Sequence, residues 1–433
     1  MSEKFIEAGY EITENIKEAD ICVVNTCSVT NVSDRKSRQM IRKAKEKNSK
    51  SIIVVTGCYA QVSTKQIEQM PEVNLIIGNN EKKDIIEYIE KYINQNEDKT
   101  VEIDNKCELE EQVSNLNKII DVKDAFEPKE FADFGTITYT EKTRAAIKVQ
   151  DGCDRFCSYC IIPYARGRVR SRKPESIIKE IEAVTKKGIK EVVITGIHIA
   201  SYGKDFSKND NSQEYRLIDL LEEINKIEEI KRIRLGSIEP TLITDEFINR
   251  LIKLDKICHH FHLSLQSGCD ETLKRMNRRY TIQEFKEVVK RLRTAYDDVI
   301  LTTDIIVGFP GETEEEFNKT YEFLKEINFY KMHIFPYSIR QGTKAAEMPN
   351  QVDGAEKERR SKILIELSNN NQLKYNQSYI GRTVQVLIEE ESKGHTANYI
   401  LVKSLDKADK SENKLINFRI IGAETEYLQG KKA

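Results

Sequence analysis

Apolar runs and amphipathic segments alternate along the first 95 residues. The apolar runs are "ADICVVNTC", "SIIVVTGC" and "VNLIIGN", and helical segments such as "DRKSRQMIRKAKEK" lie between them. The opening "MSEKFIEAGYEI" also has a helical pattern. Short apolar runs separated by helices are typical of a parallel sheet that is buried on both faces. The pattern therefore predicts an α/β domain with a parallel sheet over residues 1–95.

A longer alternation of the same kind begins at residue 143. We expect strands over "RAAIKVQ", "EVVITGIH", "IRLGSIE", "HFHLSLQ", "VILTTDIIVGF" and "KMHIFPYS", with five helices between them. Two of these helices open with a capping box, formed by Thr281 with Glu284 and by Thr313 with Glu316. Six strands with intervening helices predict either a partial (β/α)6 barrel or a doubly wound sheet.

The pattern changes after a charged helix that begins near residue 354. The segments "RTVQVLIEEES", "GHTANYILVKSL" and "LINFRIIGAETEYL" read as strands with short turns and predict a small all-β barrel. Residues 96–142 are charged and weakly periodic, and we interpret them as a linker. The predicted domains are therefore residues 1–95, 143–372 and 375–433.

Composition and charge narrow the classes of function. The chain has 433 residues and a net charge of −2, so any nucleic-acid site must be a local basic patch. No apolar run approaches the length of a membrane span, and no signal-peptide pattern is present, so we predict a cytoplasmic protein without a membrane partner. Nine cysteines in such a protein should be reduced, and clustered ones then favour metal or redox chemistry over disulfides.

Three cysteines, Cys153, Cys157 and Cys160, lie close together in "DGCDRFCSYC". Three thiolates on one loop can hold an iron–sulfur cluster, which normally takes four ligands, and so leave one iron open to a small molecule. The alternative is a zinc site completed by a distant ligand. The candidates for that ligand are Cys258, His259, His260, His262 and Cys269.

A second pair of cysteines, Cys27 and Cys58, ends two predicted strands that one helix separates. In a βαβ unit both strand ends lie at the same edge of the sheet, where neighbouring strands are about 4.8 Å apart. The two thiols could therefore share a cluster. Two unrelated buried cysteines are an equally good interpretation of the spacing alone.

The triad Cys153, Cys157 and Cys160, with Tyr159 before its last cysteine and the first strand of the α/β repeat before it, resembles the radical S-adenosylmethionine (SAM) superfamily. The resemblance implies a [4Fe–4S] cluster whose open iron binds SAM, and formation of a 5′-deoxyadenosyl radical. Ligands of barrels bind at the C-terminal ends of the strands. With Tyr159, the candidate SAM-binding residues are Gly196, Ser237, Glu239, Ser264, Gln266 and Asp304.

The N-terminal motifs "VNTCSVT" and "VTGCYAQ" extend the resemblance to the methylthiotransferase family, and "GRTVQVLIEEES" resembles its C-terminal TRAM domain. The family implies a second [4Fe–4S] cluster on three cysteines, two of which match Cys27 and Cys58. The segment that should carry the third, with the first strand, is missing ahead of "EKFIEAGYEI". Cys22 lies within a predicted strand and Cys107 within the linker, so we expect a second cluster that is weakly held or absent unless Cys107 serves.

The stretch "NTCSVTNVSDRKSRQMIRKA" most resembles the threonylcarbamoyladenosine branch of this family, through its Ser-Asp-Arg-Lys-Ser-Arg segment. The resemblance implies transfer of a methylthio group to C2 of threonylcarbamoyladenosine 37 in tRNA, with flavodoxin or ferredoxin as electron donor. Four alternatives stay open: action on isopentenyladenosine, action on a ribosomal protein, a truncated tRNA-binding protein without turnover, and an iron–sulfur redox sensor.

An anticodon loop would need basic and aromatic partners. The resemblance suggests Arg166, Arg168, Arg170 and Arg172, which follow the cysteine loop, and Lys393, His395 and Tyr399 in the C-terminal barrel. A solvated basic loop is the alternative interpretation of the arginines.

Overall fold

The computed structural model describes residues 1–28, 30–96, 118–127, 130–133, 135, 143–206, 214–390, 392–406 and 412–433. The chain forms two compact units. The first comprises Met1–Phe134, Gly152–Arg168 and Ser338–Ala346, and the second comprises Gly135–Asp151, Val169–Tyr337 and Glu347–Ala433. Most of the predicted linker lies outside the described residues.

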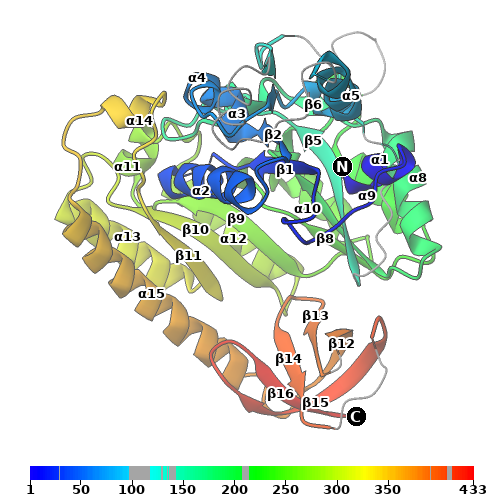
Figure 1. Ribbon diagram of the computed structural model, residues 1–433. Coiled ribbons are helices and arrows are strands. Elements are labelled where there is room, and N and C mark those ends of the chain that lie inside the picture. Colours follow the sequence, from blue (N-terminus) through cyan, green and yellow to red (C-terminus); the bar gives the residue numbers. More distant parts are fainter. Residues whose placement is uncertain are drawn as a thin grey trace. The chain divides into compact units, whose positions relative to one another are not determined.

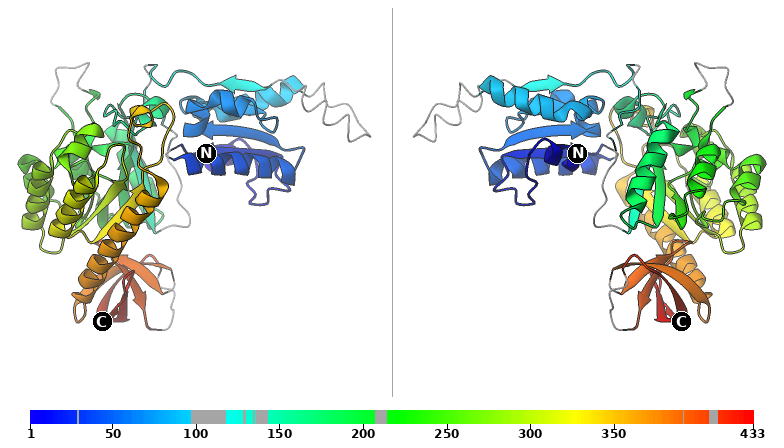
Figure 2. Two further views of the ribbon diagram at one scale, coloured as in Figure 1. Left: turned by 90° about the vertical axis from the view of Figure 1, so that its left-hand side faces the viewer. Right: turned by 90° about the vertical axis from the view of Figure 1, so that its right-hand side faces the viewer.

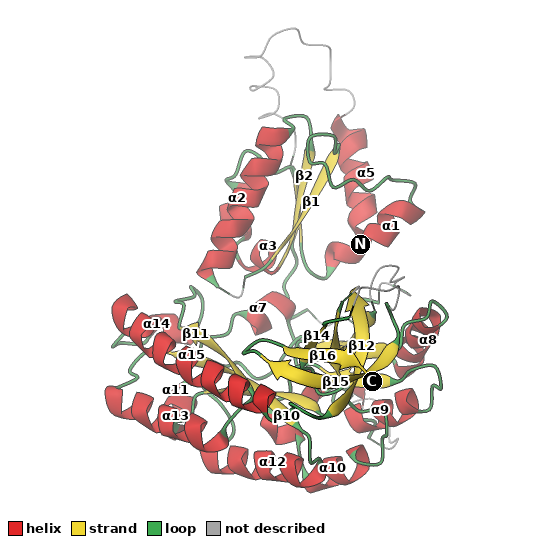
Figure 3. Cartoon of the chain, turned by 90° about the horizontal axis from the view of Figure 1, so that it is seen from below, coloured by secondary structure: helices red, strands yellow, loops and turns green. Residues whose placement is uncertain are grey.

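The first unit contains the predicted parallel sheet, with strand order β1-β2-β3-β4. Figure 1 labels β1 and β2 of this sheet. Figure 3 shows β1 and β2 between α2 on one side and α1 and α5 on the other. β4 is a short strand within the region interpreted as a linker. The bounds are α1 Ser2–Glu7, β1 Ile21–Thr26, α2 Asn31–Lys47, β2 Ile52–Gly57, α3 Cys58–Val62, α4 Thr64–Glu68, β3 Leu75–Ile77, α5 Ile85–Asn96 and β4 Ile119–Asp121.

Alternate residues of β2 explain this layering. Ile53 and Val55 pack with Ile41 of α2, whereas Val54 packs with Ile85 and other residues of α5. Because side chains alternate across a strand, a strand covered on both faces is apolar at nearly every position. The continuous apolar run "SIIVVTG" is therefore the expected sequence for this strand.

Two later segments complete the first unit. α7 (Ile162–Arg166) follows the cysteine triad, and Asn79 Nδ2 donates to the Ala165 carbonyl at 2.9 Å. In the segment 338–346, Arg340 binds Asp34 and Ser28, and the Ala345 amide donates to the Ser158 carbonyl at 2.8 Å. These contacts give the cysteine loop partners from well-separated parts of the sequence.

The second unit contains the partial (β/α)6 barrel. Its six parallel strands follow one another in sequence order, as β5-β7-β8 and β9-β10-β11, and parallel bridges link Ile233 to Ile257 and Ile238 to Leu263. A doubly wound sheet would reverse its strand order at a switch point, so the barrel alternative is confirmed. The strands are β5 Arg144–Asp151, β7 Glu191–Gly196, β8 Arg232–Leu235, β9 His260–Gln266, β10 Ile300–Val307 and β11 Lys331–Pro336, with β6 Arg170–Ser171 antiparallel to β5.

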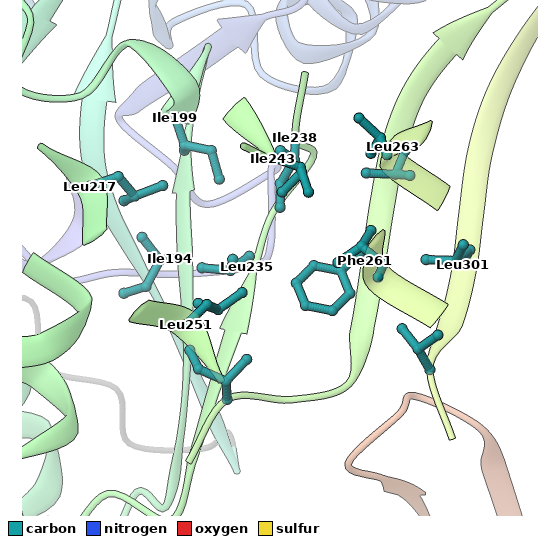
Figure 4. Close-up of a cluster of buried hydrophobic side chains, with 14 of the residues drawn as sticks. Ile194, Ile199, Leu217, Leu235, Ile238, Ile243, Leu251, Phe261, Leu263 and Leu301 are labelled. Atoms are coloured by element: carbon teal, nitrogen blue, oxygen red, sulfur yellow. The ribbon is translucent and has the colours of Figure 1, made fainter. Parts of the chain in front are cut away.

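Helices cover the outside of these strands, and both predicted capping boxes are present. Figure 4 shows the core between the two layers, where Phe261 and Leu263 of β9 lie near Leu235 of β8 and Leu301 of β10. The other face of the strands carries polar residues toward the lumen. These helices are α8 Pro174–Thr185, α9 Leu217–Asn225, α10 Asp245–Leu251, α11 Asp270–Arg275, α12 Ile282–Ala295 and α13 Glu314–Ile327. The short helix α14 (Lys344–Glu347) lies mostly in the first unit.

The long helix α15 (Gly354–Gln377) leads into a closed five-stranded barrel at the C-terminus (Figure 2). The single strand predicted over "GHTANYILVKSL" is two strands, because Tyr399 has a φ of +73° and the chain turns there. The strands are β12 Thr383–Glu390, β13 Lys393–Thr396, β14 Leu401–Ser404, β15 Leu415–Ala423 and β16 Leu428–Lys432. The small all-β barrel is thus confirmed.

None of the helices in the described ranges has both the length and the apolar composition needed to cross a lipid bilayer.

Candidate cofactor and substrate site

The cysteine triad lies on a tight loop directly after β5. Gly152 has a φ of +73°, and a Cβ atom there would lie 1.8 Å from the Arg168 carbonyl oxygen, so only glycine fits. The Cys153 amide donates to the Gly167 carbonyl at 3.0 Å, which returns the end of the loop to its start. Within the loop, the Cys160 amide donates to the Cys157 carbonyl at 3.0 Å.

The donor set of this loop fits an iron–sulfur cluster with three protein ligands. All three thiols are half-buried, and none of the described cysteines forms a disulfide. Phe156, at a φ of +50°, stacks on Phe126 with ring centroids 6.2 Å apart, and Tyr164 meets both rings edge-on. These rings provide apolar surface beside the loop. Tyr159, the expected neighbour of the last cysteine, is half-buried.

Cys27 and Cys58 follow two directly paired strands. Thr26 of β1 is in register with Gly57 of β2, and each cysteine comes next in its strand direction, as the βαβ interpretation predicts. Cys27 is exposed and Cys58 is buried. Arg166, which follows the triad, donates its Nε–H to Cys58 Sγ at 3.3 Å. The first unit therefore contains both cysteine sets.

Cys22 differs from this pair. It lies inside β1, packs against the apolar core between β2 and α2, and burial raises the pKa of its thiol. Cys107 lies outside the described residues.

The candidate SAM-binding residues have different surroundings. Ser264, Gln266 and Asp304 occupy lumen-facing positions of β9 and β10, and Gln266 has a φ of +72°. Gly196 ends β7 so close to β5 that a Cβ atom would lie 2.9 Å from the Gln150 carbonyl oxygen. Ser237 follows β8 and lines a cavity with Arg234, His260 and Tyr399.

Glu239 is the most enclosed of these candidates, with 4% of its surface exposed. It pairs with His198 Nε2 at 3.0 Å and accepts from Thr241 Oγ1 at 3.2 Å. The His198 amide in turn donates to Gln150 Oε1 at 2.7 Å. His198 and Gln150 were not among the residues predicted from the sequence. Both lie at the C-terminal ends of strands, and this position, which marked Glu239 as a candidate, could have identified them as well.

The four loop arginines divide into two pairs. Arg166 reaches Cys58, and Arg168 is exposed, pairs with Asp154 at 3.2 Å and lies over the Phe126 and Phe156 rings. Arg170 and Arg172 are buried. Arg172 binds Glu180 and Ser176 of α8, and Arg170 lies 3.9 Å from Asp151. The buried pair is thus explained by contacts within the second unit.

The expected RNA-binding residues of the small barrel also differ in their surroundings. Lys393 pairs with Glu390 at 2.9 Å on the surface. His395 pairs with Glu389 at 2.7 Å, and its ring stacks on Tyr399 at 4.7 Å. Arg144 of β5 and Arg234 of β8 lie over the same Tyr399 ring. His395 and Tyr399 therefore pack against the partial barrel.

Comparison with known proteins supports the assignment of the fold. The family model "Radical SAM superfamily" matches residues 147–324, and the model "Uncharacterized protein family UPF0004" matches residues 1–78. The chain is 39% identical to the threonylcarbamoyladenosine tRNA methylthiotransferase MtaB of Bacillus subtilis, over 99% of this chain and 91% of that protein. The chain belongs to the radical SAM methylthiotransferase family. Its branch is that of the threonylcarbamoyladenosine enzymes.

The chain also resembles a methylthiotransferase that is named for a different modified nucleoside. A tRNA-2-methylthio-N(6)-dimethylallyladenosine synthase of Caldicellulosiruptor saccharolyticus is 36% identical, over 98% of this chain and 86% of that protein. A solved radical SAM methyltransferase, TsrM from Kitasatospora setae, has a TM-score of 0.50 and 15% identity, and covers 77% of this chain and 67% of its own. This likeness concerns the fold alone.

A radical SAM methylthiotransferase uses a [4Fe–4S] cluster and SAM. The residues considered as distant zinc ligands have other partners: Cys269 Sγ donates to Glu271 at 2.9 Å, and His259 pairs with Asp298 at 2.5 Å. Cys258 is buried, which raises its pKa to about 12 and favours the neutral thiol. His260 and His262 share one face of β9, as expected, and both contact Thr302 Oγ1.

Proposed function

We propose that this methylthiotransferase converts N6-threonylcarbamoyladenosine at position 37 of tRNA to its 2-methylthio derivative. The observation that carries the proposal is the triad loop at the end of the first barrel strand, in a chain 39% identical over nearly its whole length to an enzyme named for that reaction. We also propose a cytoplasmic location, because tRNA is the proposed substrate, and a flavodoxin or ferredoxin as electron donor.

Cys153, Cys157 and Cys160 are the proposed ligands of the radical SAM cluster. Cys27 and Cys58 are proposed as two ligands of a second cluster, beside which Arg166 places a positive charge. When bound, the clusters and SAM supply the radical chemistry and the transferred methylthio group. The chain's own contribution is to hold the clusters on cysteine thiols that all belong to one compact unit.

The lumen of the partial barrel is the proposed chamber for SAM and the modified base. Its polar residues Ser264, Gln266 and Asp304 lie on the inner faces of β9 and β10. Arg166 and Arg168 remain the proposed contacts to the anticodon loop, because Arg168 offers an exposed guanidinium on two aromatic rings. We assign residues 375–433 to a TRAM domain, residues 1–95 to the N-terminal domain and 143–372 to the radical SAM domain.

The proposal is tested by mass spectrometry of tRNA nucleosides from a host that lacks its own methylthiotransferases and expresses this chain. We expect the 2-methylthio form of threonylcarbamoyladenosine to appear. A Cys157→Ala variant, expressed at the same level, should give none. Appearance of 2-methylthio-isopentenyladenosine alone would assign the chain to the other tRNA branch, and absence of both products would favour a binding protein or a protein substrate.

A further inference from the structure

A cavity of about 520 Å³ lies in the second unit, between the lumen of the partial barrel and the small barrel. Strands β8 to β11 contribute Arg234, His260, His262, Thr302 and His333, and the small barrel contributes His395, Tyr399 and the carboxylate of Glu426. His260, His262, Thr302 and His333 lie in the first halves of β9 to β11, whereas Arg234 is the third of the four residues of β8. On β9 to β11 the cavity therefore lies toward the N-terminal ends, although Gly236 and Ser237 extend its lining past the C-terminal end of β8; ligands of barrels usually bind at the C-terminal ends. Its size is that of a small-molecule pocket.

One wall of the cavity carries an excess of positive charge. We call Arg144, Arg232, Arg234, Glu191 and Glu389 the arginine cluster. Glu191 is 1% exposed and accepts from Arg234 Nε at 2.8 Å, with Arg232 at 3.7 Å and Arg144 at 3.9 Å. Arg144 also pairs with Glu389 at 2.7 Å. The cluster thus holds three guanidinium groups against two carboxylates, and a buried uncompensated charge favours binding of an anion.

Arg234 is the member of the cluster that lines the cavity, and it is 3% exposed. In the described part of the chain, its Nη1 and Nη2 atoms have no hydrogen-bond partner. Guanidinium nitrogens are strong donors with a geometry that suits carboxylates, and leaving them buried without an acceptor is costly. The side chain is held in place by its Nε bond to Glu191 and by the Tyr399 ring, 4.5 Å away.

The rest of the cavity offers hydrogen bonds. Lys331 begins β11, and His333 lies two residues further on the same face. His262 contacts Thr302 Oγ1 at 3.0 Å and Asp304 Oδ2 at 3.1 Å. The Asp304 carboxylate is therefore already engaged on one side. An occupant needs a carboxylate for the cationic wall, and hydroxyl or amide groups for the histidines and Thr302.

We propose that this cavity binds the threonylcarbamoyl substituent of the substrate nucleoside, with its carboxylate at Arg234 and Lys331 and its hydroxyl and urea groups among His262, Thr302 and His333. The inference rests on the proposed function. In adenine, C2 and C6 flank N1, so a base with C2 toward the C-terminal strand ends can extend its N6 substituent into the lumen. An isopentenyl substituent would leave these polar groups without partners, which is a strong basis for discrimination.

The test compares two anticodon stem-loop RNAs, one with threonylcarbamoyladenosine and one with unmodified adenosine at position 37. Dissociation constants for the holoenzyme, and kcat/KM for methylthiolation, are measured for wild type and for Lys331→Met and His333→Leu. Each variant should lose about 10-fold or more of the preference for the modified RNA, since each removes a charged or polar partner. Lys331→Arg should restore it. Lys253→Met, an exposed lysine after α10, is the matched control.

Retention of the full preference by both cavity variants, with wild-type product formed, would overturn the inference and leave the proposed function intact. Formation of only the isopentenyl product by wild type would overturn both. His262, Asp304 and His333 also place three possible metal ligands within 4.8 Å of one another. If zinc co-purifies with wild type and is lost in His333→Leu, the occupant of the cavity is a metal ion and not the threonylcarbamoyl substituent. That result would overturn the inference.

Discussion

His260 shows how burial fixes the protonation state of one residue. It is 8% exposed, and burial, followed by the nearby Arg234 and then by His262, His333 and His395, holds its pKa well below the ordinary histidine value. The folded protein therefore contains neutral His260, whereas the unfolded chain takes up a proton below about pH 6.5. Because the pKa of His260 is lower in the folded protein than in the unfolded chain, the free energy of unfolding is highest above about pH 6.5. It decreases as the pH falls below that value, since only the unfolded chain then takes up the proton.

Acidification should therefore destabilise the second unit through His260. Between pH 7.5 and 5.5 the expected loss is about 1.4 kcal/mol, the cost of holding the site neutral one unit below the unfolded pKa. Urea unfolding at both pH values, for wild type and His260→Gln, isolates this contribution as a difference of differences. If the free energy of unfolding changed equally with pH in the two proteins, His260 would be protonated in the folded state as readily as in the unfolded chain.

Cys58 and Cys22 provide a matched pair for the second cluster. Both lie in or beside the N-terminal sheet, but only Cys58 accepts a hydrogen bond from Arg166. We expect Cys58→Ala to reduce bound iron and to abolish the methylthio nucleoside, and Cys22→Ala to preserve both. Iron and sulfide analysis of anaerobically purified protein, with nucleoside mass spectrometry, makes the comparison. Full product from Cys58→Ala would exclude a ligand role.

The role of a single residue could be predicted only where residues nearby in the sequence indicate that role. The spacing of the triad alone pointed to a cluster, whereas the assignment of Cys27 and Cys58 also needed the family resemblance, because two unrelated buried cysteines fit their spacing equally well. Arg172 was not, because its partner Glu180 lies on the following helix and the contact depends on how that helix packs. Arg234 and His333 were missed for the same reason: their importance comes from a shared cavity, which spacing along the chain does not reveal.

At the scale of elements, the capping box of α13 is a local signal that the structure reproduces. Thr313 Oγ1 accepts from the Glu316 amide at 3.2 Å, and the Thr313 amide donates to the Glu316 carboxylate at 3.2 Å. Thr313→Ala should cost about 1 kcal/mol and lower the thermal midpoint by about 2–4 °C. Thr313→Ser keeps the acceptor and should match wild type. A midpoint unchanged in Thr313→Ala would mean that other contacts fix this helix end.

Long periodic elements were predictable, and short ones were not. The strands of the partial barrel and their helices follow from apolar periodicity, because packing in two layers demands it. β4 and β6, of three and two residues, carry too few positions for a period and form only because a neighbouring strand is present. The break between β13 and β14 at Tyr399 requires a positive φ that nothing in a tyrosine signals.

At the scale of the whole molecule, the charge balance constrains how this enzyme meets RNA. The net charge is only −2, with 69 lysines and arginines against 71 acidic residues, so attraction to phosphates must arise from local groups. Arg168 is the clearest such group, since its side chain is 63% exposed and, among the described residues, its ion-pair partner is the exposed Asp154. Binding should accordingly weaken with salt, with a slope set by a few phosphate contacts.

Replacing Arg168 by glutamine should reduce the slope of log K against log salt concentration by about 0.7, the value for one phosphate contact in a single-stranded region. Binding of an anticodon stem-loop is measured from low to physiological salt. Lys362→Gln, on the exposed face of α15 and paired with Glu358 at 2.8 Å, is the control and should keep the wild-type slope. Because both variants remove one positive charge, equal slopes in the two variants would show that Arg168 makes no phosphate contact of its own.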